Sequence, residues 1–64
     1  MLRKIAGECS DGVTCPAAWD DEEDGTVIVQ GYQAVVADLP PAPDGEARVR
    51  VPREILLQAA RELQ

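Results

Sequence analysis

Five consecutive acidic side chains lie in the middle of the chain, followed by a glycine: Asp20, Asp21, Glu22, Glu23, Asp24 and Gly25. Clustered carboxylates can bind a cation or a basic protein surface. A calcium loop counted from Asp20 would need a glutamate at its twelfth position, which is Gly31 here. Acid–base catalysis needs a buried carboxyl, whereas an acidic turn of this kind is solvated. The run therefore predicts either a solvated hairpin tip or a docking site for a basic partner.

Two cysteines, Cys9 and Cys15, flank the turn-forming sequence Ser10-Asp11-Gly12. Three states are open for them: free thiols, a disulfide across the short loop, or metal ligation. A structural zinc site needs four ligands, but the chain has two cysteines and no histidine. A zinc site would therefore need two chains. The spacing also differs from the Cys-x-x-Cys motif of redox enzymes.

Three arginines, Arg48, Arg50 and Arg53, lie close together near the C-terminus. Arg48 and Arg50 would share one face of a strand and form a short basic strip. The strip is either an exposed face paired with local acids or a contact for nucleic acid or an acidic protein. The sequence contains no nucleophile–base pair and no glycine-rich phosphate loop. We expect no catalytic site and, apart from the zinc alternative, no cofactor.

The size of the chain limits what it can enclose. Its 64 residues predict one domain, residues 1–64, with one Trp, one Tyr and no Phe. A core this small supplies only about 3–5 kcal/mol without a disulfide, a metal or a partner chain. We expect it to enclose no pocket of the roughly 300–1,000 Å³ that small-molecule sites need. Size thus favours a protein that acts by binding rather than by catalysis.

The charge distribution points to a protein partner. The net charge is −6, and residues 6–47 carry ten acidic groups and no basic one. Nucleic-acid binding needs a net basic footprint, so it is disfavoured, whereas electrostatic docking on a basic protein is favoured. The sequence shows neither a membrane-spanning apolar run nor a signal-peptide pattern, so we expect a cytoplasmic protein without a membrane partner.

The pattern of apolar residues predicts strands followed by one helix. Residues 26–36 form the main strand, whose β-branched Val27-Ile28-Val29 is typical of a central strand covered on both faces, with a bend at Gly31. Residues 13–19 predict a weaker strand that Pro16 places at an edge or a bulge. Residues 2–5 predict a short strand, and the alternation over 46–51 predicts a half-buried one. The proline-rich segment 38–45 should be extended and end in an Asp-Gly turn.

The C-terminal helix should begin at Pro52 and run to Leu63. Its apolar residues fall within an arc of about 140°, typical of a core-facing stripe: Ile55, Leu56, Ala59, Ala60 and Leu63. Leu57 lies outside this stripe and is either an ordinary exposed leucine or a contact with a second chain. Tyr32 is a further candidate contact.

Together these elements predict an α+β fold: a small twisted antiparallel sheet of three to four strands with one C-terminal helix. One helix cannot cover both faces of such a sheet, which favours a homodimer.

Several segments resemble the BldB-like domain, a small actinobacterial domain of unknown function: Arg3-Lys4, the strand at Cys15, Gly25-Thr26-Val27-Ile28-Val29, and Val51-Pro52-Arg53-Glu54 before a helix. The resemblance implies an actinobacterial source and a protein partner, a helix-turn-helix transcription regulator. The sequence departs from the family pattern at residues 29–33 and after Glu54, so no site residue is carried over.

A second resemblance is local. Residues 48–55 look like the strand–proline–helix segment of AbrB-type DNA-binding proteins. It implies a DNA-binding dimer that uses Arg48, Arg50 and Arg53. The net charge of −6 opposes this alternative. The sequence therefore favours an accessory module that binds a basic regulator through residues 20–24, with the AbrB-like dimer and a zinc-stapled structural module as alternatives.

Overall fold

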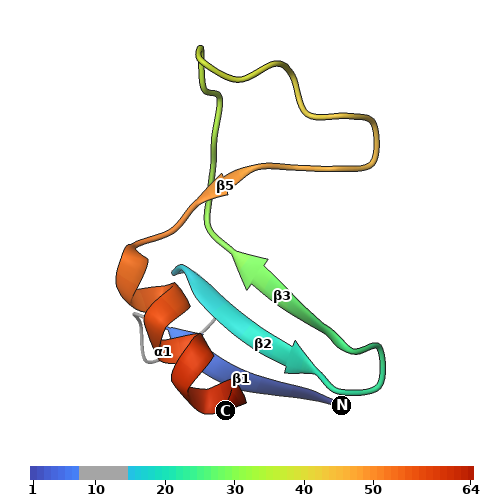
Figure 1. Ribbon diagram of the computed structural model, residues 1–64, viewed down its shortest axis with the longest axis vertical. Coiled ribbons are helices and arrows are strands. Elements are labelled where there is room, and N and C mark those ends of the chain that lie inside the picture. Colours follow the sequence, from blue (N-terminus) through green and yellow to red (C-terminus); the bar gives the residue numbers. More distant parts are fainter. Residues whose placement is uncertain (8–14) are drawn as a thin grey trace.

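The computed structural model describes residues 1–7 and 15–64. Its elements are, in chain order, β1 (Leu2–Gly7), β2 (Ala17–Asp21), β3 (Thr26–Gln30), β4 (Tyr32–Gln33), β5 (Val49–Arg50) and α1 (Arg53–Leu63). β1, β2 and β3 form an antiparallel sheet with β2 in the centre, and β4 and β5 form a separate antiparallel pair. Figure 1 shows α1 beside the larger sheet, with residues 31–51, here called the arm, extending away from it. The expected α+β fold is confirmed, with the strands divided between two sheets.

The central strand is β2, so of the two effects expected of Pro16 on residues 13–19, an edge position or a bulge, the edge position is wrong. β2 begins directly after Pro16, which is buried. The proline therefore removes no N–H from the ladder that β2 forms on both sides. Residues 8–14, including Val13, lie outside the described part of the chain. β2 also continues through Asp20 and Asp21, so the turn itself consists of residues 22–25.

The core lies between α1 and the β1–β2 half of the sheet. It consists of Ile5, Ala6, Ala18, Ile55 and Ala59, with Val51 packed against it. The expected helix is confirmed, but only Ile55 and Ala59 of the expected stripe are buried. The alanines of the sheet let α1 approach closely, and the helix packs on β1 and β2. Three residues of the stripe are therefore left exposed: Leu56, Ala60 and Leu63.

The expectation of one long strand over residues 26–36 is wrong. The segment divides at Gly31 into β3 and β4, which belong to different sheets. β3 is an edge strand, and Val27, Ile28 and Val29 remain 38%, 44% and 36% exposed. A run of β-branched residues favours a strand, but it does not determine how many neighbours that strand has.

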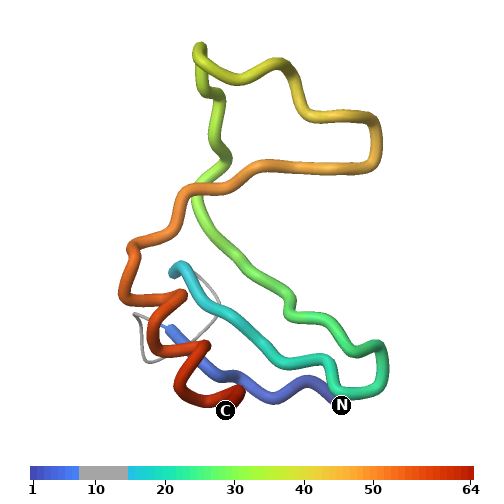
Figure 2. The backbone as a smooth tube through the Cα atoms, in the orientation of Figure 1, coloured from blue at the N-terminus to red at the C-terminus, as the bar shows by residue number. Residues whose placement is uncertain are grey.

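The break occurs at Gly31 because the chain returning from the arm crosses there. A Cβ atom at this position would overlap the carbonyl oxygen of Arg50 and lie 2.6 Å from Cγ1 of Val51. The bend expected at Gly31 is thus confirmed, and its cause is a close approach between two backbone segments. Figure 2 shows the two segments of the tube meeting at the base of the arm.

The arm is a long hairpin with little regular structure. The strand expected over residues 46–51 is reduced to β5, whose residues pair with Tyr32 and Gln33, and one further hydrogen bond runs from the N–H of Ala34 to the carbonyl of Arg48 at 3.0 Å. The Asp-Gly turn is confirmed, since Gly45 has a φ of +85° and the N–H of Glu46 donates to the carbonyl of Pro43.

Arg3 ties β1 to the end of α1. Its guanidinium lies 3.5 Å from Asp20 and 3.7 Å from Glu62, and it donates to the carbonyl of Glu62. The Arg3 side chain is 47% exposed, so solvent screens these ion pairs. The contact nevertheless joins β1 to the last turn of α1.

Replacing Arg3 with glutamine should lower the free energy of unfolding by about 1 kcal/mol, because a cluster of half-exposed ion pairs is lost. Urea denaturation checks this, and the difference from the parent chain should shrink in 1 M salt. The matched variant is Arg53→Gln, at the exposed first residue of α1, which should change stability by less than about 0.5 kcal/mol. Equal losses in both variants would contradict a specific role for Arg3.

Candidate protein-binding surface

The acidic residues sit at the tip of the β2–β3 hairpin. Gly25 closes the turn with a φ of +71°, and its N–H donates to the carbonyl of Asp21 at 2.9 Å. The Asp21 carboxylate accepts from the N–H of Asp24, and the Asp24 carboxylate accepts from the Thr26 hydroxyl. Asp21 and Asp24 therefore stabilise the turn that carries them.

The other three acids divide between the sheet and solvent. The Asp20 side chain is only 15% exposed and faces Arg3. Glu22 is 72% exposed and lies 4.0 Å from the guanidinium of Arg3. Glu23 is 84% exposed and lies 3.0 Å from the N-terminal ammonium. Such exposed pairs are weak and compete readily with solvent or a partner. Of the five predicted residues, Glu22 and Glu23 are thus the ones best placed to meet another molecule. We call this pair the acidic tip.

The three arginines have different surroundings. Arg48 donates to the carbonyl of Pro40 inside the arm, Arg50 lies in β5 opposite Tyr32, and Arg53 is the first residue of α1. The hydrogen bond from the N–H of Ala34 continues the β4–β5 pairing as far as Arg48, so Arg48 and Arg50 stay two residues apart on an extended segment. The bond to Pro40 makes Arg48 part of the arm, whereas Arg50 and Arg53 are exposed.

Cys15 is disulfide-bonded. Cys9, the other cysteine in the sequence, lies outside the described residues. A bridged sulfur is not a thiolate ligand, so the zinc alternative would apply to the reduced chain. Within residues 1–7 and 15–64, no three potential metal ligands gather at one place.

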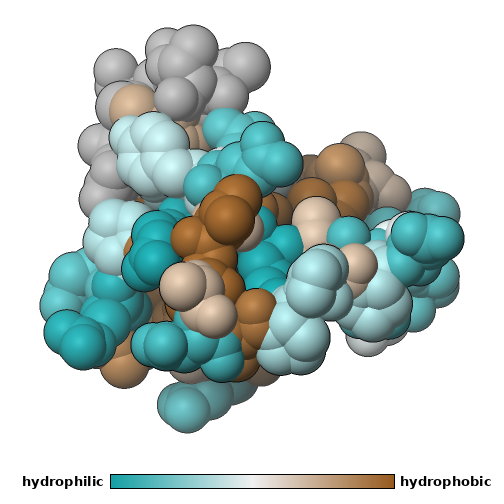
Figure 3. Space-filling view, turned by 90° about the horizontal axis from the view of Figure 1, so that it is seen from above, coloured by the Kyte–Doolittle hydropathy of each residue, from teal (hydrophilic) through white to brown (hydrophobic). Residues whose placement is uncertain are grey.

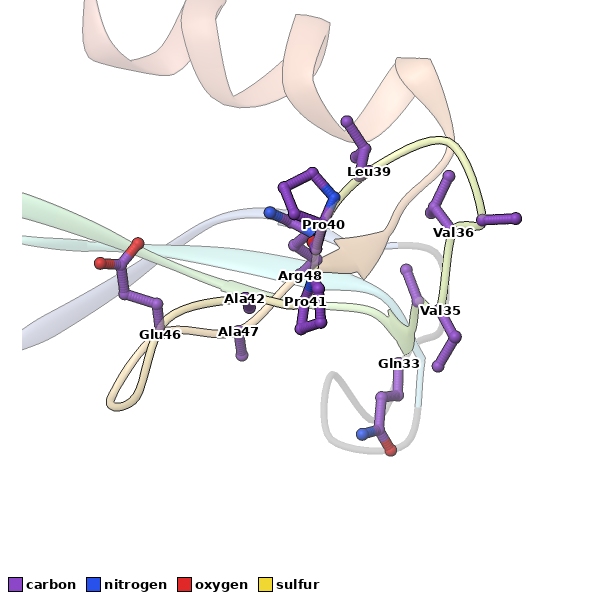
Figure 4. Close-up of a pocket in the computed structure, with 12 residues that line it drawn as sticks. Gln33, Val35, Val36, Leu39, Pro40, Pro41, Ala42, Glu46, Ala47 and Arg48 are labelled. Atoms are coloured by element: carbon purple, nitrogen blue, oxygen red, sulfur yellow. The ribbon is translucent and has the colours of Figure 1, made fainter.

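The arm contains a hollow of about 380 Å³ that is half open to solvent, whereas the expectation from the size of the chain concerned an enclosed pocket. The hollow arises because the hairpin loop is wide, and its lining is mainly alanine, valine, leucine and proline. Its polar lining residues do not converge: Gln33 and Glu46 lie well apart, and Arg48 lies beside Pro40 and Pro41 (Figure 4). This geometry offers an apolar recess without an arrangement of acid, base and nucleophile.

A further surface was missed by sequence reasoning. Residues of a strand alternate between the faces of a sheet, so Val27 and Val29 lie on the same face as the core residue Ala18, which pairs with Val29. α1 covers β1 and β2 on that face, and both valines remain exposed.

The exposed leucines of α1 point toward the same region, beside Val27 and Val29 of β3. Glu62 contacts Arg3 on β1, so the β1 side of the helix is the side of Glu62. Leu56 and Leu63 lie across the Ile55–Ala59 stripe from Glu62 and therefore point to the β3 side. They are 54% and 46% exposed. We call Val27, Val29, Leu56 and Leu63 the β3–α1 apolar surface. The sequence did contain a signal for this surface. The apolar stripe of the helix is wider than one small sheet can cover.

The two remaining candidate contacts are both exposed but lie apart. Tyr32 is 63% exposed in β4, and Leu57 is 51% exposed on α1. Leu57 lies on the helix about 200° from Ile55, so it points away from the sheet. Exposed apolar side chains are a general feature of this molecule: Figure 3, viewed from the arm, shows them reaching the surface between polar ones. The predicted roles of Tyr32 and Leu57 in partner binding stay predictions.

The geometry defines a small α+β domain whose accessible features are an acidic hairpin tip and an uncovered apolar strand edge. No family model, curated protein or solved structure matches the chain. The resemblances to BldB-like and AbrB-type proteins therefore stay predictions. No helix among the described residues has the length and apolar character needed to cross a membrane.

Proposed function

We propose that this protein is a non-enzymatic accessory module that binds a basic protein through its acidic tip. The observation that carries the proposal is the position of Glu22 and Glu23, exposed at the end of a hairpin whose turn is stiffened by Asp21 and Asp24. A rigid tip loses little conformational entropy when a partner binds. The net charge of −6 would also attract a basic protein over a distance of several ångströms.

The proposed partner is a helix-turn-helix transcription regulator. Such proteins present a basic surface to DNA, and an acidic module that occupies that surface would compete with DNA. The BldB-like resemblance supports the same class of partner. In this proposal the module modulates transcription without contacting DNA itself.

The double substitution Glu22→Gln, Glu23→Gln should weaken binding of helix-turn-helix regulators from the same genome by about tenfold at low salt. Two exposed charge contacts of a few tenths to 1 kcal/mol each account for this loss. Isothermal titration calorimetry measures it. The affinity of the parent chain should fall as salt rises, and the affinity of the double variant should fall less steeply.

The matched control is Asp44→Asn, Glu46→Gln, which removes the same number of exposed charges from the arm. It should keep the affinity of the parent chain within about twofold, because its charges lie away from the tip. If the arm variant weakens binding as much as the tip variant, net charge and not the tip governs the interaction. If the affinity of the parent chain does not change with salt, the electrostatic mechanism is wrong.

A cytoplasmic location is part of this proposal, since transcription regulators act there. The disulfide at Cys15 opposes it, because disulfides persist mainly in oxidising compartments. The proposal therefore requires that the fold and the acidic tip remain when the disulfide is reduced.

A further inference from the structure

The outer edge of β3 lacks most of the features that normally prevent an edge strand from pairing with another strand. β2 pairs with one side of it, and no strand of the described residues pairs with the other. Natural edge strands are protected by lysines, prolines, bulges or extreme shortness. β3 has none of the first three, since its five residues are Thr26-Val27-Ile28-Val29-Gln30 with a regular register against β2. This edge is a ready template for another strand.

The sequence of β3 is complementary to itself. If two copies pair antiparallel about Ile28, then Ile28 faces Ile28, Val27 faces Val29, and Thr26 faces Gln30. Each apolar residue thus meets an apolar one, and each polar residue meets a polar one, as cross-strand pairing favours. We infer that the protein forms a homodimer in which two β3 strands join edge to edge around a two-fold axis at Ile28.

The charges of the two copies permit this arrangement. β3 itself carries no charge. In the proposed register Asp24 of one copy aligns with Tyr32 of the other, so the two acidic turns lie about 26 Å apart along the strands. This exceeds the Debye length of about 8 Å at physiological salt. Each acidic turn is also directed toward the partner's β4, which pairs with Arg50.

The apolar residues left exposed by the single chain also support a second copy. A two-fold axis perpendicular to the sheet keeps both α1 helices on one face. The β3–α1 apolar surfaces, with Val27, Val29, Leu56 and Leu63 from each copy, then meet across the joined strands. Ile28 lies on the opposite face, on the same side as Trp19, with which it pairs. A second chain is one of the few means by which so small a core gains stability.

A cysteine cross-link tests the register. Paired residues in an antiparallel ladder have Cα atoms about 4.5–5.5 Å apart, which a disulfide spans. Ile28→Cys should therefore form a covalent dimer with oxidised glutathione, seen at twice the chain mass of 6.9 kDa by intact mass spectrometry. Thr26→Cys is the matched control, because the two copies of residue 26 are about 13 Å apart in this register. Equal cross-linking of both variants would overturn the register.

A second variant tests the dimer without cross-linking. Ile28→Lys places two lysines opposite each other and removes the apolar pair at the two-fold axis, so it should raise the dimer dissociation constant by roughly 100-fold or more. Val35→Lys, at a position 91% exposed in the arm, should leave the constant unchanged. Native mass spectrometry and sedimentation measure both. A parent chain that is monomeric at 100 µM, or an Ile28→Lys variant that dimerises as tightly as the parent, overturns the inference. Neither result bears on the acidic tip, which each copy carries by itself.

Discussion

Replacing Ile55 with alanine should leave most of the reduced chain unfolded at room temperature. Ile55 is 2% exposed and supplies one of the two large aliphatic side chains of the core, the other being Ile5. Alanines Ala6, Ala18 and Ala59 make up the rest. Truncation of a buried isoleucine to alanine costs about 2–5 kcal/mol, whereas the core of a domain of this size supplies only about 3–5 kcal/mol without a disulfide. The loss therefore approaches the whole stability of the reduced monomer.

Circular dichroism and urea denaturation measure this effect. The control is Leu57→Ala on the same helix, where the side chain is 51% exposed and alanine is the better helix former. It should change the free energy of unfolding by less than about 0.5 kcal/mol. A cooperative transition for Ile55→Ala within 1 kcal/mol of the parent would show that the core of the protein lies elsewhere.

Gly31→Ala should destabilise the fold by about 2–3 kcal/mol, close to the cost of overpacking a core. Gly31 has no positive φ, so backbone strain is not the reason. The added Cβ would overlap the carbonyl oxygen of Arg50, and backbone atoms cannot move aside without opening the β4–β5 pair. We expect the two strands of the arm to separate before the rest of the chain unfolds, and hydrogen exchange at the N–H of Ala34, which bonds to Arg48, reports this opening.

Gly7→Ala is the matched control for Gly31→Ala. The Cβ built at Gly7 also meets another group closely, but that group is the end of the Lys4 side chain. A flexible side chain can move at little cost, so we expect a loss of less than about 1 kcal/mol. If Gly7→Ala and Gly31→Ala lower stability equally, the crossing at Arg50 is not the constraint that breaks the strand.

The sequence was most informative where a signal is local. The helical spacing after Pro52, the turn at Asp44-Gly45 and the hairpin tip at Gly25 all depend on residues adjacent in the chain, and all are confirmed. The bend at Gly31 was also predictable, but its cause was not. The residue that excludes a side chain there is Arg50, nineteen positions later, and no local pattern reports such a contact.

The position of β3 could not be predicted for a related reason. Val27-Ile28-Val29 has the composition of a buried strand, but burial depends on how many neighbouring strands the rest of the chain supplies. The arm takes β4 and β5 away into their own pair, so β3 is left at an edge. The same shortage of strands leaves Leu56 and Leu63 uncovered. Residues that look like core in the sequence thus become the surface from which we infer a dimer.

The acidic residues show how far the site itself was predictable. The run from Asp20 to Asp24 identified the hairpin tip. Composition alone does not show which of these residues stabilise the fold and which remain accessible to a partner. The register places Asp20 toward Arg3, and the turn geometry uses Asp21 and Asp24. What remains accessible is the pair Glu22 and Glu23.

We propose that the β2–β3 hairpin is the part of the molecule that meets other proteins. Backbone amide chemical shifts of the ¹⁵N-labelled chain test this most directly, recorded on dilution and during titration with a helix-turn-helix regulator. We predict that dilution shifts the amides of residues 26–30 and that the regulator shifts those of residues 22–24. Shifts confined to residues 34–48 of the arm, or no change in either series, would contradict this proposal.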